Sequence, residues 1–263
     1  MKLELNYHAS VQATSKAPLL FIHGMAHAAW CWEWKFVPFF NQAGYDCYTL
    51  SLRGHGKSEG HEKIRWHSIN DYLQDVKSAI KLINSTPILI GHSMGGFIIQ
   101  KYLLEGKEAP AAITLSAVPA RGMLKGSLKI AANFPWQFLK GNLTMSTAPF
   151  SESEDIVRTI AFSDDVDKSL LKKVKENMEP ESYRAYLDML LLNLHKPAYV
   201  NTPLLFLYAE NDFIVDYEGW KQTADGFGAE QQVIPNICHD MFLDTYWETV
   251  ASTIKHWLSQ KNL

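Results

Sequence analysis

The sequence is poor in cysteine and contains no long apolar run. Its three cysteines, Cys31, Cys47 and Cys238, are an odd number and have neither a C-x-x-C nor a metal-site spacing. Such usage favours a reduced compartment, so we expect a cytoplasmic protein. No apolar segment approaches the roughly 20 residues that span a bilayer, and the first residues alternate in polarity, unlike a cleaved signal peptide. We therefore expect neither stable membrane insertion nor secretion by a cleaved signal.

An excess of charge of either sign is also missing. The chain has 25 Lys and Arg against 28 Asp and Glu, which makes a formal net charge of −3. Because there is no basic excess, nothing in the composition predicts a nucleic-acid partner. With 263 residues, 47% of them hydrophobic, the chain can bury a sizeable core in one large domain or in a core domain with an insertion.

Strand and helix patterns alternate through the first 116 residues. Short apolar runs of strand length are separated by longer stretches whose apolar residues recur at helical spacing. The expected strands cover residues 1–7, 19–22, 47–51, 86–90 and 111–115, and the expected helices cover residues 32–42, 68–84 and 96–104. This alternation predicts an α/β fold, with a mostly parallel central sheet flanked by helices on both faces.

The alternation stops in the middle of the chain. Between residues 119 and 198 there is no convincing buried strand, and amphipathic helical runs occur at 127–139, 152–160, 167–178 and 181–194. Strand patterns return at 203–208 and 231–234, and a last helix is expected over 246–258. We therefore expect a core domain of residues 1–118 and 199–263, with residues 119–198 inserted as a helical cap.

The stretch Gly91-His92-Ser93-Met94-Gly95 lies where a buried strand should meet a helix. The order of strand, G-x-S-x-G and helix is the context of a nucleophile elbow, in which the serine occupies a sharp turn. Gly91 and Gly95 have no Cβ, so that the turn can close without a steric clash. The pattern predicts a nucleophilic Ser93 at the carboxyl end of the sheet. A glycine-rich connection with an incidental serine is the alternative.

A serine hydroxyl needs a base to take its proton and an anion to hold that base. His239 and Asp212 each follow an expected strand, and they complete the chain order serine, acid, histidine. Both should emerge at the carboxyl edge of the sheet, beside Ser93. Asp216 and Asp240 compete for the role of the acid. Asp212 is preferred because it follows its strand by only a few residues.

Acyl transfer develops a negative oxygen, which needs preorganised N–H donors. One predicted donor is the backbone N–H of Met94, directly after the nucleophile. The second is the N–H of Met25, in the loop after the strand over residues 19–22, where Gly24 allows a close approach. His23 in the same loop is interpreted as a structural residue. This chemistry requires no metal and no organic cofactor.

A few aromatic and imidazole side chains are candidates for a substrate pocket. Trp136 and Phe138 lie with Phe134 in the inserted segment, where packing within the cap explains them at least as well. His27 is a candidate in the loop after the strand over residues 19–22, which we call the oxyanion loop, although an ordinary buried histidine is the simpler interpretation. Phe213, next to the expected acid, completes the predicted pocket.

With these elements in this order, the chain resembles the α/β-hydrolase superfamily over essentially its whole length. Many members share the loop Arg53-Gly54-His55-Gly56-Lys57-Ser58. The run from His23 to Trp32 is similar to that of plant methylesterases and hydroxynitrile lyases, and the sequence around Ser93 and His239 resembles bacterial esterases and lysophospholipase-like hydrolases. The resemblance implies an eight-stranded sheet and a helical cap over the active site.

These features predict a serine hydrolase that cleaves a small or medium carboxylic ester, a small-molecule partner, through an acyl-enzyme on Ser93. A thioesterase, lactonase, amidase or C–C bond hydrolase would use the same residues. Hydroxynitrile-lyase chemistry is a minor alternative, because a lysine follows the catalytic histidine in that branch and Asp240 stands there in this chain. A hydrolase-fold ligand receptor with slow turnover is a further class. The oligomeric state is left open.

Overall fold

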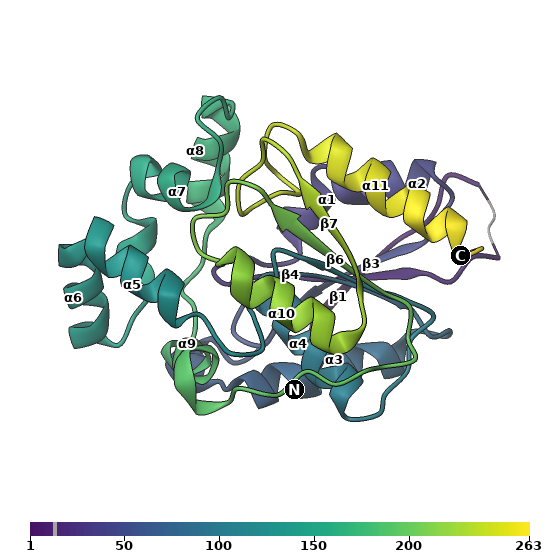
Figure 1. Cartoon of the computed structure of the whole chain (residues 1–263), viewed down its shortest axis with the longest axis horizontal. Helices are drawn as coiled ribbons and strands as arrows, with labels where there is room; N and C mark the ends of the chain where they lie inside the picture. Colours follow the sequence, from purple (N-terminus) through teal and green to yellow (C-terminus); the bar gives the residue numbers. More distant parts are fainter. Residues whose placement is uncertain (13–14) are drawn as a thin grey trace.

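The computed structural model describes residues 1–12 and 15–263, and a seven-stranded sheet forms its centre (Figure 1). The strands are β1 (Glu4–His8), β2 (Leu19–Ile22), β3 (Cys47–Ser51), β4 (Ile88–His92), β5 (Ala112–Leu115), β6 (Leu204–Ala209) and β7 (Glu230–Ile234). Their order is β1-β3-β2-β4-β5-β6-β7, and every neighbouring pair except β1 with β3 is parallel. The prediction of an α/β fold with a mostly parallel sheet is confirmed, and the carboxyl ends of β2 to β7 share one edge.

The expectation of eight strands is wrong for the described residues. β1 pairs directly with β3, from Glu4 opposite Ser51 to His8 opposite Cys47. Between β1 and β2 the described residues form no strand. Two of their backbone donors have other partners, since the Ser10 N–H donates to the Asp46 carboxylate and the Val11 N–H to the Asn41 carbonyl.

Helices cover both faces of the sheet (Figure 1). One layer consists of α1 (Trp30–Glu33), α2 (Phe36–Gln42) and α11 (Trp247–Gln260), and the other of α3 (Ile69–Leu82), α4 (Met94–Leu104) and α10 (Tyr217–Phe227). Successive residues of β2 divide between the layers: Leu19 and Phe21 pack with the first, Leu20 and Ile22 with the second. Because side chains alternate along a strand, a sheet covered on both faces needs continuous apolar runs, as the sequence has.

The chain between β5 and β6 forms helices, and we call residues 119–198 the cap segment. It contains α5 (Leu124–Asn133), α6 (Pro135–Thr144), the 3₁₀ turn η2 (Ala148–Ser151), α7 (Glu154–Ala161), α8 (Lys168–Asn177), α9 (Tyr183–Leu187) and the π-helical turn η3 (Asp188–Leu192). All its residues are described, and none lies in a strand. In Figure 1 its helices α5 to α8 stand beyond one end of the sheet. Within the described parts of the chain, no helix is long and apolar enough to cross a bilayer.

Two helices predicted as continuous are broken by proline. The helix expected over 32–42 is divided into α1 and α2, because Pro38 has no N–H to donate to the carbonyl of Trp34. The helix expected over 127–139 is divided into α5 and α6 at Phe134, since the residue before Pro135 is pushed out of the helical region.

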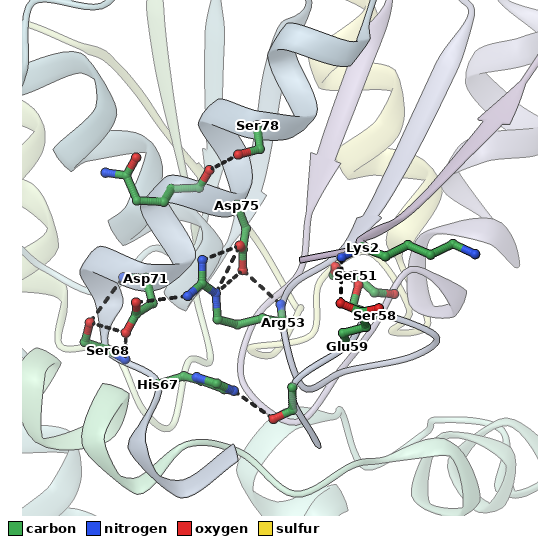
Figure 2. Close-up of polar contacts among 12 residues, drawn as sticks. Lys2, Ser51, Arg53, Ser58, Glu59, His67, Ser68, Asp71, Asp75 and Ser78 are labelled. Carbon is green, nitrogen blue, oxygen red and sulfur yellow. Dashed lines mark hydrogen bonds and ion pairs between the residues drawn. The ribbon is translucent and has the colours of Figure 1, made fainter. Parts of the chain in front are cut away.

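The loop that follows β3 is tied to the start of α3 (Figure 2). Arg53 forms ion pairs with Asp71 and with Asp75, at 2.9 and 2.7 Å between nitrogen and oxygen. Ser68 caps α3, because its hydroxyl accepts the Asp71 N–H at 3.1 Å while the Asp71 carboxylate accepts the Ser68 N–H. Residues 53–58 are therefore anchored to a helix of the core.

Candidate active site

Ser93 occupies the sharp turn between β4 and α4. Its φ angle is +49°, a strained value for a residue with a Cβ that persists only where the surroundings fix it. They do so here, since the Ser93 N–H donates to the Leu115 carbonyl at 2.9 Å and the Ser93 carbonyl accepts the Val118 N–H at 3.2 Å. A Cβ on Gly95 would lie 2.3 Å from the carbonyl oxygen of Ile22. Only glycine therefore lets the first turn of α4 pack against the end of β2.

His239 and Asp212 meet beyond the carboxyl ends of β7 and β6. The imidazole Nδ1 of His239 lies 2.8 Å from Oδ2 of Asp212, and both side chains are buried. The other carboxylate oxygen, Oδ1, accepts the N–H groups of Ile214 and Val215, each at 2.8 Å. Because a carboxylate only accepts, Nδ1 carries the proton and Nε2 of the neutral ring keeps a lone pair. This arrangement leaves His239 able to take a proton at Nε2.

The charges of this pair shift both pKa values. Burial lowers the pKa of His239, but the Asp212 carboxylate outweighs burial and holds that pKa above its ordinary value. Burial raises the pKa of Asp212, whereas the His239 imidazole and the hydrogen bonds to the carboxylate bring it below its ordinary value. Asp212 is therefore ionised near neutral pH and favours the imidazolium form of His239.

The two competing acids have other partners. Asp216 caps α10 by accepting the Gly219 N–H at 3.0 Å, and it pairs with Lys125 at 2.8 Å. Asp240 is buried, and its Oδ2 lies 3.1 Å from Nε2 of His27. Burial raises the pKa of Asp240, but the neighbouring imidazoles of His27, His92 and His239 together outweigh burial and leave that pKa at about 2. Neither acid is placed to hold Nδ1 of His239.

The two predicted oxyanion donors lie beside Ser93. Met94 is the first residue of α4, where a backbone N–H has no partner within the helix. Met25 follows β2 and lines the same cavity as Ser93 and His239. A Cβ on Gly24 would lie 3.2 Å from Cβ of Ser93, so the loop that carries Met25 passes directly over the nucleophile.

A cavity lies between the edge of the sheet and the cap segment. Its volume is about 140 Å³, and part of it is open to solvent. Ser93, His239 and His27 line it on the core side. The cap side is mainly apolar and includes Ile130, Phe138, Phe150, Val157, Ile160, Met178, Tyr183 and Tyr186.

Two of the predicted pocket residues do not line this cavity. Trp136 is 68% exposed, because it follows Pro135 in the first turn of α6, on a different side of that helix from Phe138. Phe213 is half-buried and faces the cap instead, where it contacts the ring of Phe134 and the ammonium group of Lys129. Phe138 and His27 do line the cavity.

Sequence reasoning missed two carboxylates at the cavity wall, Glu179 and Glu181. They flank Pro180 in a polar run between two helices, which is typical of an exposed turn. Glu181 is nevertheless only 2% exposed. No pattern in the sequence indicates this burial, because the partners of Glu181 lie far away in the chain.

One cluster of possible metal ligands occurs among the described residues. Donor atoms of His92, His239 and Asp240 lie within 4.8 Å of one another. His92 is hydrogen-bonded through Nε2 to the His239 carbonyl at 3.0 Å, and burial lowers its pKa to about 3, so its ring is neutral. Each member of the cluster therefore has a polar partner, since His239 contacts Asp212 and Asp240 contacts His27.

Comparisons with known proteins give a consistent result. The sequence profile of the family described as "Serine aminopeptidase, S33" matches residues 13–246. A monoacylglycerol lipase of Mycolicibacterium smegmatis is 24% identical over 230 residues, which are 83% of this chain and 80% of the lipase.

Solved structures of similar shape cover nearly the whole chain. The BpoC protein of Mycobacterium tuberculosis H37Rv superposes with a TM-score of 0.80 at 19% identity, over 99% of this chain and 97% of that one. A soluble variant of the monoglyceride lipase of Saccharomyces cerevisiae, in complex with a substrate analogue, gives a TM-score of 0.73 at 20% identity, over 98% and 92%. Both are α/β-hydrolases in fold.

Proposed function

The chain belongs to the serine aminopeptidase family of α/β-hydrolases, and from that membership we propose that it is a serine hydrolase. It cleaves a small or medium carboxylic ester through an acyl-enzyme on Ser93. The observation that carries this proposal is the contact of 2.8 Å between His239 Nδ1 and Asp212, because it leaves Nε2 free in a cavity that Ser93 also lines.

The reaction begins when the Ser93 hydroxyl oxygen attacks the ester carbonyl carbon. His239 takes the hydroxyl proton at Nε2, and Asp212 stabilises the imidazolium that forms. The N–H groups of Met25 and Met94 hold the negative oxygen of the tetrahedral intermediate. His239 then gives its proton to the leaving alcohol. In the second half-reaction it takes a proton from water as the water oxygen attacks the acyl carbonyl carbon, and it returns this proton to the Ser93 oxygen as the acid is released.

The wall of the cavity favours an apolar acyl group. Rings and methyl groups of the cap segment, such as Phe138, Phe150 and Ile160, face the nucleophile across the cavity. Burial of apolar surface is the main driving force available to such a wall. The lipase from Mycolicibacterium smegmatis is a monoacylglycerol lipase by name, which supports an ester with an aliphatic chain as the substrate class.

Hydroxynitrile-lyase chemistry is disfavoured by the surroundings of Asp240. In that branch a lysine would follow the base, whereas here Asp240 is buried and paired with His27. The negative charge at this position does not suit stabilisation of a cyanide anion.

The test is labelling with a fluorophosphonate followed by a panel of substrates. We expect a single phosphonylated residue, Ser93, identified by peptide mass spectrometry. The panel runs from p-nitrophenyl acetate to the dodecanoate and includes a thioester and an aminoacyl p-nitroanilide of matched size. Preference for an ester supports the proposal, while absence of labelling, or turnover of the anilide alone, contradicts it.

A further inference from the structure

Two hydrogen bonds join the cap segment to Ala26, which follows Met25 in the oxyanion loop. Ala26 has a φ of +61°, which is unfavourable for a residue with a Cβ and requires support from outside the loop. That support comes from the turn between α8 and α9. The Glu179 N–H donates to the Ala26 carbonyl at 3.0 Å, and the Ala26 N–H donates to Oε2 of Glu181 at 3.2 Å. Both polar groups of the residue that follows Met25 are thus held by the cap.

The carboxylate of Glu181 has no access to solvent and is surrounded by donors. Its Oε1 accepts the Tyr72 hydroxyl at 2.7 Å and the Ser182 N–H at 2.6 Å. Its Oε2 accepts the Ala26 N–H and lies 3.3 Å from Nε2 of His55. Because a buried charge is costly unless it is paired and hydrogen-bonded, this full set of partners fixes the carboxylate in one position.

His55 supplies the opposite charge. Its Nδ1 lies 3.2 Å from the Arg53 carbonyl and must therefore donate, while its Nε2 faces the carboxylate. Burial lowers the pKa of His55, but Glu181 outweighs burial and raises it above its ordinary value. The contact is an ion pair of two fully buried groups. It joins the cap to residues 53–58, the loop that Arg53 ties to α3 (Figure 2).

Glu179 makes a second contact between the cap segment and the loop of residues 53–58. Its carboxylate accepts the Gly56 N–H at 2.8 Å, so both acidic residues of the turn reach the loop of residues 53–58. The oxyanion loop therefore lies between the core and the cap and depends on both for its backbone conformation.

We propose that Glu181 is a positioning residue of the oxyanion hole: from the cap, it holds Ala26 and thereby fixes the Met25 N–H beside Ser93. The inference rests on the proposed function, since it assumes that Met25 stabilises an oxyanion. Glu181 does not touch the reacting atoms. It makes the oxyanion hole complete only when the turn between α8 and α9 is docked on the core.

Glutamine at position 181 is the informative replacement because it keeps the size of the side chain. Three hydrogen-bond donors and the His55 imidazole converge on the two carboxylate oxygens, whereas an amide offers one oxygen and places an NH₂ group at the other site. His55 can turn neutral and accept from this NH₂, but the backbone N–H of Ala26 or of Ser182 cannot accept. Glu181→Gln thus leaves one backbone N–H facing another donor and loosens the loop.

The experiment compares kcat, KM and the affinity for a trifluoromethyl ketone with the preferred acyl chain. The Ser93 oxygen adds to the carbonyl carbon of this ketone, and the hemiketal that forms places a negative oxygen in the oxyanion hole. For Glu181→Gln we expect kcat to fall roughly 10- to 100-fold with KM within about threefold, since small misplacement of catalytic groups is that costly. The inhibition constant of the ketone should rise by a similar factor.

Two further variants complete the experiment, the first as a control and the second as an independent test. Glu176→Gln makes the same chemical change at an exposed position at the end of α8, and it should leave all three quantities unchanged. Tyr72→Phe removes one hydrogen bond to Glu181 without touching the cavity, and kcat should fall roughly threefold to tenfold. If Glu181→Gln does not fold, Tyr72→Phe decides alone.

The outcomes separate this inference from the proposed function. Wild-type kcat and ketone affinity in Glu181→Gln, or in Tyr72→Phe where that variant decides, overturn the positioning role. A rise in KM with unchanged kcat also overturns it, because Glu181 would then bind substrate. If Ser93→Ala still hydrolyses the ester, the proposed function fails and the inference fails with it.

Discussion

The core and the cap segment form opposite walls of one cavity by different means. On the core side Ser93, Asp212 and His239 each stand within a few residues of a strand end, so the parallel sheet brings them to one edge. On the cap side the lining residues come from several helices and turns, and each helix also presents residues to solvent. The order of the strands thus positions the predicted catalytic residues, whereas the packing of the helices positions the apolar wall.

The buried histidines show the same contrast. His239 has its carboxylate on Nδ1, which leaves Nε2 without a carboxylate partner, and the residue lines the cavity. In His27 and His55 a backbone carbonyl occupies Nδ1 and a carboxylate faces Nε2. In these two rings Nε2 therefore lies within ion-pair distance of a carboxylate, at 3.1 Å for His27 and 3.3 Å for His55. Of these three imidazole–carboxylate pairs, the pair on the strand ends has its carboxylate on Nδ1, which is the arrangement that the proposed proton transfer needs.

The largest expected effect is that of Ser93→Ala. Removal of the nucleophile typically lowers kcat by about 10⁶, so ester hydrolysis and fluorophosphonate labelling should both be lost. Thermal unfolding should remain cooperative, since the change removes one hydroxyl and keeps the backbone. Near wild-type turnover would contradict the assignment of Ser93.

The next largest effect is expected from a change at Asp212, and the same change at Asp240, the other buried acid near His239, serves as the comparison. Asp212→Asn should lower kcat by roughly 10⁴, because an amide at Nδ1 favours the wrong tautomer of His239. Asp240→Asn makes the same change on the carboxylate that pairs with His27, and its effect on kcat should be far smaller. Steady-state kinetics of both variants decide the point, and a larger loss in Asp240→Asn would reverse the assignment.

The elements that position this chemistry are visible in the sequence. Strand, G-x-S-x-G and helix occur in immediate succession around Ser93, and the acid and the base follow strands in the expected chain order. These patterns are local. Because the carboxyl ends of parallel strands lie at one edge of the sheet, residues that follow different strands in the sequence come together there. The seven strand patterns, the layers of helices and the contact of Asp212 with His239 could therefore be anticipated from the residues, whereas the eighth strand is expected only from the family resemblance.

The cap wall could not be predicted in the same way. Trp136 and Phe138 are two residues apart in one helix, so they cannot share a face, yet only packing decides which of them is covered. Glu181 is hidden from sequence reasoning for a related reason. Its partners Tyr72 and His55 are more than a hundred positions away, and a polar run around Pro180 gives no sign of burial.

The pH dependence of kcat/KM reports the protonation state of His239. His239 must be neutral to act as a base, and its pKa is held above the ordinary value of about 6.5 by Asp212. Below that pKa, kcat/KM should fall tenfold per pH unit as the imidazole protonates, and it should level off above. A profile that stays flat from pH 5 to 8 would remove His239 from the role of base.

The smallest expected effect distinguishes the covered face of α6 from its exposed face. Phe138 lines the cavity, whereas Trp136 is 68% exposed. Phe138→Ala should lower kcat/KM for the longest esters of the panel roughly tenfold, since loss of apolar contact with a substrate chain is worth 1 to 3 kcal/mol. Acetate esters, which are too short to reach that wall, should change little. Trp136→Ala should leave the whole panel unaltered. Equal losses for all chain lengths in Phe138→Ala would mean that this wall supports the fold and does not select the acyl chain.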